Sequence, residues 1–304
     1  MSNQPAKIPF AKPWVSYTDQ VQLLQQRGLL VADPQAAELF LSHLNYYRFS
    51  GYCLAFESQR HTFNGGATFE DVVAAYHFDL TLRDLLTEAL EVVEVDLRAA
   101  IAHDFGKQHG AFGHTDPARF FQHFQHIAWL EGLRREADRS NELFVNHFRQ
   151  TYSEFPDLPV WIVTEVMSFG TLSHMYKGMV RADQRSVANR YGIQASILQS
   201  WMHHCVYVRN LCAHHSRLWD RVWSIKPTFP PINDWQPPLL PSNRNLFSTL
   251  LLLRRFMSRI PAVQAFSEQW KQRVEQHISQ PPSAPNPQGR MGLTNLWMQH
   301  PVWI

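Results

Sequence analysis

An apolar stripe with helical spacing runs from about Phe69 to about Phe105, and the rest of the chain must pack around it. Residues that recur every third or fourth position share one face of an α-helix, whereas a strand would need alternation at every second position. The stripe consists of Leu82, Leu86, Leu90, Val93, Leu97 and Ile101, and the other faces carry Glu88, Glu91, Glu94 and Arg98. The stretch therefore predicts one long helix with a single buried face.

The remainder of the chain predicts further helices, without a convincing strand or hairpin pattern. We expect them at about 18–27, 33–46, 117–140, 141–152, 159–180, 181–191, 195–214 and 244–278, with Asp33-Pro34 as an N-cap and a break at Pro261. Residues 227–241 are rich in proline and predict an irregular connection, and the aromatic residues of the Pro-rich tail, 279–304, predict that it docks on the body. We expect one all-α domain over residues 1–304.

Composition limits the class of protein. The hydrophobic fraction of 45% supports a substantial core, and the net charge of +2 leaves anion binding to local sites, for which the 22 arginines are suited. The three cysteines lack disulfide spacing, MSNQPAKIPFAKPW does not resemble a signal peptide, and the apolar run Leu246–Leu253 is too short to span a bilayer. We therefore expect a cytoplasmic protein with no membrane partner.

Arg209 interrupts the apolar face of the helix expected over 195–214. At about 100° per residue, this face holds Leu198, Trp201, Met202, Cys205, Val208 and Cys212, and Arg209 falls about 20° from Leu198. An unpaired guanidinium is costly to bury, so Arg209 must meet an acid or line a cavity that takes an anion. Asn210 and His214 share a different face, at about 120° and about 160°. One copy of the chain therefore forms an incomplete site, and this geometry indicates that a second copy completes it.

The same segment, HHCVYVRNLCAHH (203–215), offers histidines and cysteines for an alternative metal site. Cys205 and Cys212 share a face but lie about 10 Å apart along the axis. A tetrahedral zinc needs each sulfur at about 2.3 Å, so the two cysteines do not bind one ion together. We interpret both as small apolar residues of the seam and expect no metal and no cofactor. A site that uses one cysteine and residues from elsewhere stays open.

The string RNLCAH (209–214) matches the R-x4-H signature of HEPN ribonucleases, and RNLCAHHSRLW resembles the hallmark of the Abi proteins, the AbiD/AbiF-type abortive-infection family of phage resistance. A bare R-x4-H recurs by chance in helical proteins. The resemblance is carried by four further blocks in the family's order, LNYYRFSGYCLAF (44–56), VEVDLRAAIAH (93–103), PVWIVTEVMSFGTLSHMY (159–176) and MGLTNLWMQHPVW (291–303).

This resemblance implies an HEPN-like helical bundle with additional N- and C-terminal helices, acting as a homodimer that cleaves RNA without a metal. The ribose 2′-hydroxyl would attack the adjacent phosphate and leave a cyclic phosphate. The resemblance assigns His214 as general acid or base, since an imidazole titrates near neutral pH. It assigns Arg209 to the phosphate and its developing charge, and Asn210 to His214 or a phosphate oxygen. A toxin-like effector of this kind implies restraint by an antitoxin RNA or protein.

Two other functions stay open. A non-catalytic RNA-binding or scaffolding HEPN protein would keep a positive cleft without cleaving. A metal-dependent nuclease or transferase would use the clustered histidines and cysteines. In the RNA-binding or scaffolding protein, Arg209 and His214 would be needed only for RNA binding, whereas a ribonuclease would need both for RNA breakage. The metal-dependent enzyme would contain bound zinc or would lose activity in the presence of a chelator.

Arg98 and His103 form a second R-x4-H. Glu94 precedes Arg98 by four residues, which predicts a helical ion pair between them. Related HEPN proteins place a polar residue of an earlier helix against the motif arginine. Glu91, Glu94 or Arg98 is the candidate for this supporting role.

Four further residues are candidates with two interpretations each. Glu165 lies on a largely apolar helix, where it either pairs with Arg209 or sits exposed at the rim. The residues after the motif either contact the RNA backbone or form a solvated helix end; these are His215, Arg217 and Arg221. The cluster 46–48, Tyr-Tyr-Arg, is expected in the core rather than in a base-stacking platform.

Overall fold

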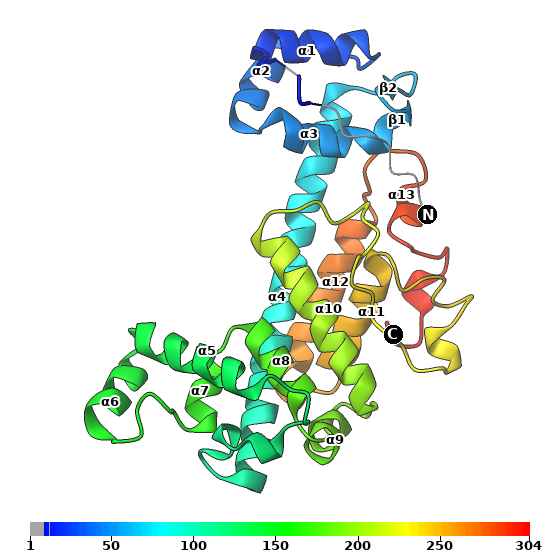
Figure 1. Cartoon of the computed structure of the whole chain (residues 1–304). Coiled ribbons are helices and arrows are strands. Elements are labelled where there is room, and N and C mark those ends of the chain that lie inside the picture. Colours follow the sequence, from blue (N-terminus) through cyan, green and yellow to red (C-terminus); the bar gives the residue numbers. More distant parts are fainter. Residues whose placement is uncertain (1–8, 12) are drawn as a thin grey trace, which may run out of the picture. The chain divides into compact units, whose positions relative to one another are not determined.

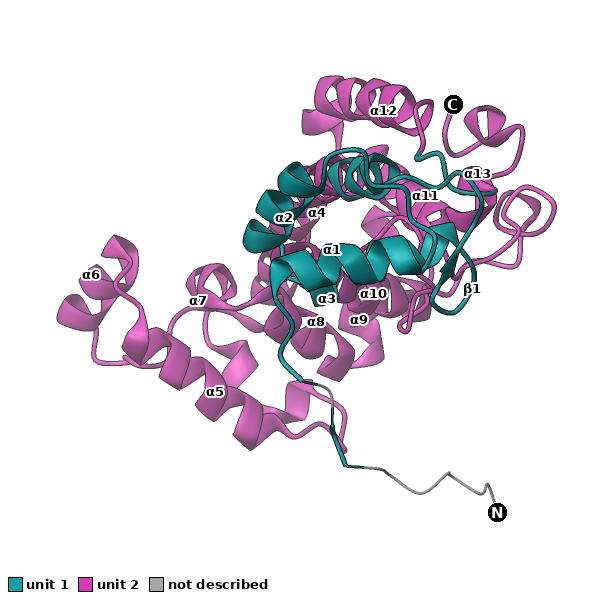
Figure 2. Ribbon diagram, turned by 90° about the horizontal axis from the view of Figure 1, so that it is seen from above, with its two compact units in different colours: residues 1–78, 282–285 teal, residues 79–281, 286–304 magenta. Residues whose placement is uncertain are grey.

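The computed structural model describes residues 9–11 and 13–304 (Figure 1). Most of the N-terminal stretch considered above for a signal peptide lies outside these residues. The chain divides into two compact units, residues 1–78 with 282–285 and residues 79–281 with 286–304 (Figure 2). The long helix α4 (Phe69–His109) contributes its first ten residues to unit 1 and the others to unit 2. A single domain over the whole chain stays a prediction.

Unit 1 contains α1 (Tyr17–Gln26), α2 (Pro34–His43), α3 (Tyr46–Cys53) and a short antiparallel hairpin of β1 (Glu57–Gln59) and β2 (Thr62–Phe63). Asp33 caps α2 by accepting a hydrogen bond from the Ala36 N–H, with Pro34 at the first helical position, as predicted. The sequence pattern did not predict α3 or the hairpin, because both are too short to show a period.

The expected core position of residues 46–48 is wrong for Tyr47, which is 86% exposed, and for Arg48, which is also exposed. The buried face of α3 belongs instead to Phe49, Tyr52 and Cys53. Tyr47 lies two residues before Phe49, so its side chain points to the opposite side of the helix.

The helix α4 (Phe69–His109) confirms the long helix that the stripe predicts. All six residues of the stripe are at most 1% exposed. Two other helices of unit 2 bond directly to α4. The Trp270 indole of α12 (Gln264–Ile278) donates to the Leu85 carbonyl at 2.7 Å, and Arg190 of α9 (Arg181–Arg190) pairs with Asp104 at 2.6 Å. The helices α9 and α12 therefore pack against α4, as expected.

The other helices of unit 2 are α5 (His126–Arg139), α6 (Leu143–Thr151), α7 (Val160–Val166), α8 (Phe169–Gly178), α9 (Arg181–Arg190), α10 (Ala195–Ala213), α11 (Leu246–Met257), α12 (Gln264–Ile278) and α13 (Pro287–Arg290). The single helix expected over 159–180 is wrong, because Ser168 starts α8 by accepting from the Thr171 N–H. The break expected at Pro261 is confirmed, with a 3-10 turn at Pro261–Val263 between α11 and α12. The all-α fold class is also confirmed.

The C-terminal tail packs on α11 and α12. Met291 and Trp303 are fully buried, and the Trp303 ring lies 5.9 Å from the Trp270 ring of α12. The Trp303 indole donates to the Glu275 carboxylate at 2.8 Å, and the His300 ring bonds to the Asp234 carbonyl of the Pro-rich connection at 2.7 Å. None of the described helices combines the length and the apolar character that crossing a bilayer requires.

Candidate functional site

The helix α10 ends in a tight left-handed turn directly after the motif. The Ser216 N–H donates to the Leu211 carbonyl at 2.8 Å, and the His215 N–H donates to the Cys212 carbonyl at 2.9 Å. This pair of hydrogen bonds is typical of a helix C-terminus at which the residue after the C-cap has a left-handed backbone conformation. Glycine usually occupies that position. Here it is His215, with a φ of 53°. The chain therefore reverses immediately after His214.

A buried carboxylate fixes the segment that follows this turn. Asp79 of α4 is fully buried and accepts from the Leu218 N–H at 3.0 Å and the Trp219 N–H at 2.8 Å. Its second partner is Arg83, one helical turn later, at 2.8 Å. Leu218 and Trp219 are themselves fully buried. Asp79 thus ties the chain beyond the motif to α4.

Sequence reasoning missed Asp79 and Arg83 as determinants of the site. Their signal was the spacing of four residues between an acid and a base on a helix whose neighbouring positions are apolar. The resemblance directed attention to Glu94 and Arg98, farther along the same helix.

Arg209 and Asn210 lie near the C-terminal end of α10, His214 is its C-cap, and all three residues are exposed. Within the described part of the chain, none of the three side chains has a hydrogen bond or ion pair. Arg209 and His214 are five residues apart, which corresponds to about 7.5 Å along the axis and about 140° around it for a regular helix. Their charged and polar atoms are open to a ligand from solvent.

Arg209 lies on the apolar side of α10 but is exposed, and it has no ion pair with an acid in the described chain. Leu198 and Met202, which share its side of α10, are fully buried, but Ala213 on that side is exposed. The cover over this side of α10 reaches Val208 and Cys212, which are buried, but does not extend over Arg209 and Ala213. Arg209 lies on the packing side of the helix where nothing in the described chain covers it.

Glu94 and Arg98 form the ion pair that their spacing predicts. Arg98 also donates to the carbonyls of Thr164 and of Met167, the latter at 2.7 Å. A cation on the last carbonyls of a helix stabilises its C-terminus, so this arginine holds the end of α7 against α4. Arg98 therefore has a structural role in unit 2, which is to connect α4 to the end of α7.

Glu165 is exposed on α7, the second of its two interpretations. It lines a cavity of about 500 Å³ together with the exposed His103, Lys107 and Trp161. It has no ion pair with Arg209 in the described structure. The second R-x4-H is therefore divided, because Arg98 is bound to α7 while His103 faces this cavity.

The charged residues after the motif bond to their own segment. Arg217 pairs with Asp220 at 3.3 Å, and Asp220 also accepts from Arg290 at 2.9 Å. The Arg221 Nε donates to the Arg217 carbonyl at 2.7 Å. His215 is exposed in the left-handed turn. These arginines stabilise the loop that Asp79 anchors.

The histidines and cysteines of 203–215 do not converge. The His204 Nδ1 lies 2.7 Å from the Ile225 carbonyl and its Nε2 lies 2.9 Å from the Thr249 hydroxyl. A carbonyl only accepts, so Nδ1 carries the proton and Nε2 accepts from the hydroxyl. Burial lowers the pKa of His204 to about 4, which keeps the ring neutral.

Burial also raises the pKa of the Cys205 thiol and raises the pKa of Cys212 to about 12, so both remain protonated and are poor metal ligands. Among the described residues, no three side chains of His, Cys, Asp or Glu are grouped so that they could hold a metal ion.

The comparison with protein families identifies one match. No curated protein and no solved structure matches the chain. The family model described as Abi-like protein matches residues 39–220, which is more than half of the 304 residues. The matched range includes the motif of α10 and ends at Asp220, in the segment that Asp79 anchors; the block at 291–303 lies outside it. The chain belongs to the family of Abi-like proteins.

Proposed function

We propose that the chain is a metal-independent endoribonuclease that acts as a toxin-like effector of phage defence by abortive infection. The observation that carries the proposal is the exposure of Arg209, Asn210 and His214 at the end of α10, with no partner for their side chains in the described chain. Such groups are available for a phosphate and its proton transfers. Membership of the Abi-like family supports the role in phage resistance.

The chemistry needs a base, an acid and a cation. A base removes the proton of the ribose 2′-hydroxyl, whose oxygen then bonds to the adjacent phosphorus. The bond from phosphorus to the 5′-oxygen breaks, and an acid gives that oxygen a proton. His214 takes one of the two proton-transfer roles, and Arg209 binds the phosphate oxygens that gain charge in the transition state. Asn210 donates to a phosphate oxygen or orients His214. DNA lacks the attacking hydroxyl, so RNA is the substrate.

A homodimer supplies the part that one chain lacks. Arg209 and His214 diverge by about 140° around α10, so one chain does not direct both at one phosphate. A two-fold dimer brings each surface against its own copy. The uncovered side of α10 around Arg209 and Ala213 is the surface that such a dimer would cover. In this arrangement Arg209 acts together with the partner's His214.

The first test is cleavage of total cellular RNA by the purified chain in excess EDTA. We expect the unaltered protein to cleave and to leave cyclic phosphate ends, and Arg209→Ala and His214→Ala to lose cleavage. Arg139→Ala and His147→Ala are matched controls, because they remove the same side-chain types from exposed positions on α5 and α6. They should cleave normally.

The outcomes separate the alternatives. RNA binding that depends on Arg209 without any cleavage would favour the RNA-binding or scaffolding protein. Cleavage that EDTA abolishes would favour a metal-dependent nuclease. An antitoxin RNA or protein that restrains the activity would be sought by co-purification from the native host.

A further inference from the structure

The exposed side of α10 is a continuous stripe that ends at the motif. The residues of this stripe that are not buried recur at three- and four-residue spacing; they are Ser196, Gln199, Ser200, His203, Val206 and Asn210. Such residues lie along one face of a helix. From Ser196 to Asn210 the stripe is about 21 Å long at 1.5 Å per residue. An extended ligand that is bound at Asn210 and runs toward the N-terminal end of α10 would therefore contact this face of the helix.

A cavity of about 530 Å³ lies along the middle of the stripe, between α8 and α10. Its cationic and titratable lining residues are Lys177 and His174 of α8 and His203 of α10, all exposed. Hydroxyl and amide groups line the rest of its α10 side, from Ser196, Gln199 and Ser200. The cavity thus offers hydrogen-bond donors and positive charge beside the stripe.

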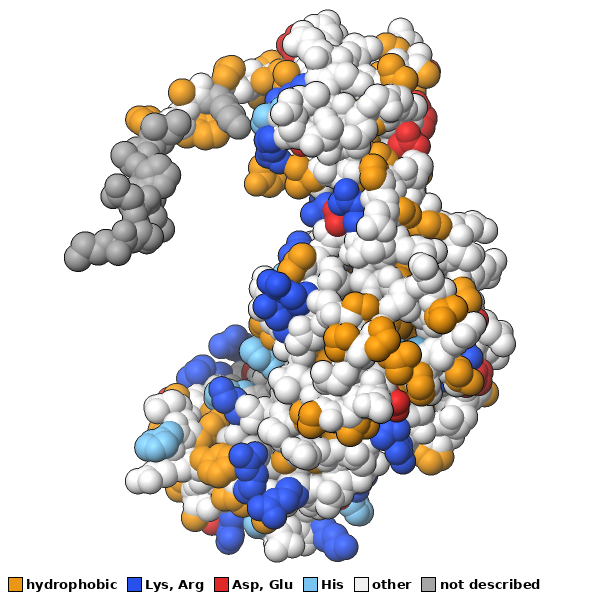
Figure 3. Space-filling model, turned by 90° about the vertical axis from the view of Figure 1, so that its right-hand side faces the viewer, with side chains coloured by type: hydrophobic (Ala, Val, Ile, Leu, Met, Phe, Trp, Pro, Cys, Tyr) orange, Lys and Arg blue, Asp and Glu red, His pale blue; other side chains and the backbone are white. Residues whose placement is uncertain are grey.

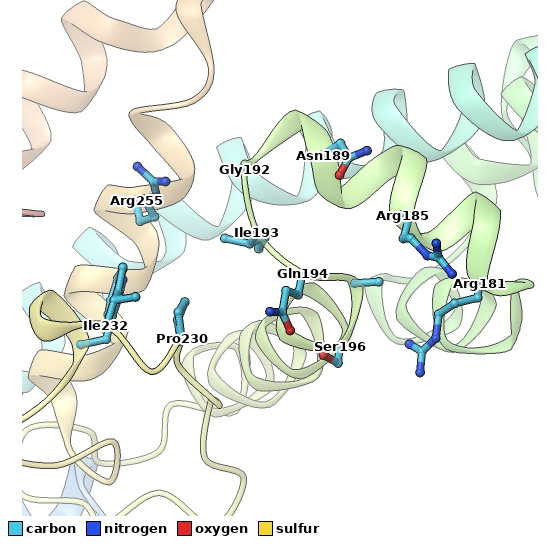
Figure 4. Close-up of a pocket in the computed structure, with 12 residues that line it drawn as sticks. Arg181, Arg185, Asn189, Gly192, Ile193, Gln194, Ser196, Pro230, Ile232 and Arg255 are labelled. Atoms are coloured by element: carbon cyan, nitrogen blue, oxygen red, sulfur yellow. The ribbon is translucent and has the colours of Figure 1, made fainter.

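A second cavity, of about 620 Å³, lies at the N-terminal end of α10. Figure 4 shows Arg181 and Arg185 on α9 at one side of it and Arg255 on α11 at the other. Ser196 lines both cavities, so the two cavities adjoin at this residue.

Within the described residues, the cations of the second cavity form no ion pair with a carboxylate. Arg185 and Arg255 have no ion pair or side-chain hydrogen bond within the described residues. Burial and the neighbouring Arg259 lower the pKa of the Arg255 guanidinium, and the Asp234 carboxylate offsets only part of this effect. Neither cavity has an aspartate or glutamate among the described residues that line it. On the face of the molecule that Figure 3 draws, Lys and Arg side chains are also more frequent than Asp and Glu side chains. A chain of phosphates has the charge that complements this surface.

We propose that the stripe of α10 and its two cavities form one track for a single strand of RNA, which runs from the arginines at the N-terminal end of α10 to the motif at its C-terminal end. The inference rests on the proposed function and specifies how that site holds its substrate. At about 3.4 Å per stacked nucleotide, about 21 Å corresponds to about six nucleotides. The track makes binding depend on RNA length, because a fragment at the motif alone does not reach the arginines.

The test measures binding of single-stranded RNAs of about twelve and about three nucleotides by fluorescence anisotropy in EDTA, with the full chain. The variants are Arg185→Glu and Lys177→Glu, both at exposed positions outside the motif. Arg139→Glu is the control, because it makes the same change of charge at an exposed residue that lines neither cavity.

We expect each track variant to weaken binding of the longer RNA by about tenfold relative to Arg139→Glu and to lower the salt dependence by about one phosphate contact. Binding of the short RNA should change no more than in the control. Equal losses for both lengths would overturn the track, as would a longer RNA that binds the track variants and the control alike. Inorganic phosphate that occupies the arginines without displacing the longer RNA would indicate a separate small-anion site and also overturn it.

Failure of the proposed function gives a different result. A chain that binds the longer RNA through Arg185 and Lys177 but leaves it intact would keep the track and remove the ribonuclease. A chain that cleaves RNA equally well in the track variants and in Arg139→Glu would keep the ribonuclease and remove the track.

Discussion

The buried Asp79 is the single residue on which the backbone after the motif most depends. Its carboxylate accepts from two backbone N–H groups and from Arg83, all away from water. Asp79→Ala would leave the Arg83 charge buried and two N–H groups without their acceptor. Breaking a buried ion pair in this way costs about 3–5 kcal/mol, so we expect the free energy of unfolding, measured with urea, to fall by that amount.

Glu88 provides the matched control on the same helix. It pairs with Arg273 at 2.6 Å, but the two side chains are 37% and 52% exposed. Exposed pairs contribute about 0–1 kcal/mol, so Glu88→Ala should leave the unfolding curve nearly unchanged. Similar losses of unfolding free energy in Asp79→Ala and Glu88→Ala would mean that burial does not explain the contribution of Asp79 to stability.

The contacts and exposure of some residues can be predicted from the sequence alone, and those of others cannot. The motif and the pair Glu94–Arg98 depend on spacing along one helix, which a sequence displays directly. The exposure of Arg209 depends on where the cover over α10 ends, which no local pattern records. The same limit applies to Asp79, whose partners Leu218 and Trp219 are 139 and 140 residues away in the sequence.

At the scale of elements, His204 joins α10 to the connection before α11 and to α11 itself, through Ile225 and Thr249. Its pKa of about 4 lies below the value of about 6.5 for an unfolded histidine. The unfolded chain therefore binds more protons between these pH values. The stability from neutral His204 is complete above about pH 6.5 and is lost as the pH falls toward about 4, by about 2 kcal/mol at about pH 5.

Urea unfolding at several pH values measures this loss. In His204→Gln, the free energy of unfolding should fall less between about pH 7 and about pH 5 than in the unaltered protein. The neighbouring His203 is exposed, so His203→Gln should leave this pH dependence unchanged. Burial also lowers the pKa of His114 to about 4, so part of the decline remains in His204→Gln. An unchanged slope in His204→Gln would show that this ring does not couple the junction of α10 and α11 to pH.

The end of α8 depends on a close approach at Gly178. A Cβ there would lie 2.5 Å from the Phe124 ring, which itself contacts the rings of Phe120 and His174 at 5.0 and 4.9 Å. Gly178→Ala should therefore lower the free energy of unfolding by about 1–3 kcal/mol. Gly132 lies inside α5 with only the Arg135 side chain near its added Cβ, at 3.9 Å. Gly132→Ala should instead stabilise by about 0.5–1 kcal/mol, and thermal melts that show the same sign for both would contradict this account.

Elements were predictable where a period is long enough to see. The helix α4 repeats its apolar stripe many times, and proline marks the break between α11 and α12. The break at Ser168 was missed because apolar residues continue on both sides and only the cap interrupts them. The helix α3 and the hairpin are shorter than the window in which a period can be recognised.

At the scale of the whole molecule, the division into two units separates the motif from the N-terminal helices. The motif, its anchor Asp79 and both cavities along α10 belong to unit 2. The family match nevertheless begins at residue 39, within unit 1. The family resemblance was visible in ordered sequence blocks, whereas this division depends on contacts between distant residues, which the sequence does not display.

A shared site makes a prediction about mixed dimers. If Arg209 of one chain acts with the partner's His214, a dimer of Arg209→Ala with His214→Ala has one site with both groups lost and one with both intact. Random pairing makes about half of the dimers mixed, each with one of two sites intact, so co-expressed variants should recover about a quarter of the cleavage. Arg209→Ala with the double variant Arg209→Ala/His214→Ala should recover none. If sedimentation shows mixed dimers but no cleavage returns, the arginine and histidine of each site come from one chain, and the proposed division of the site between two chains is wrong.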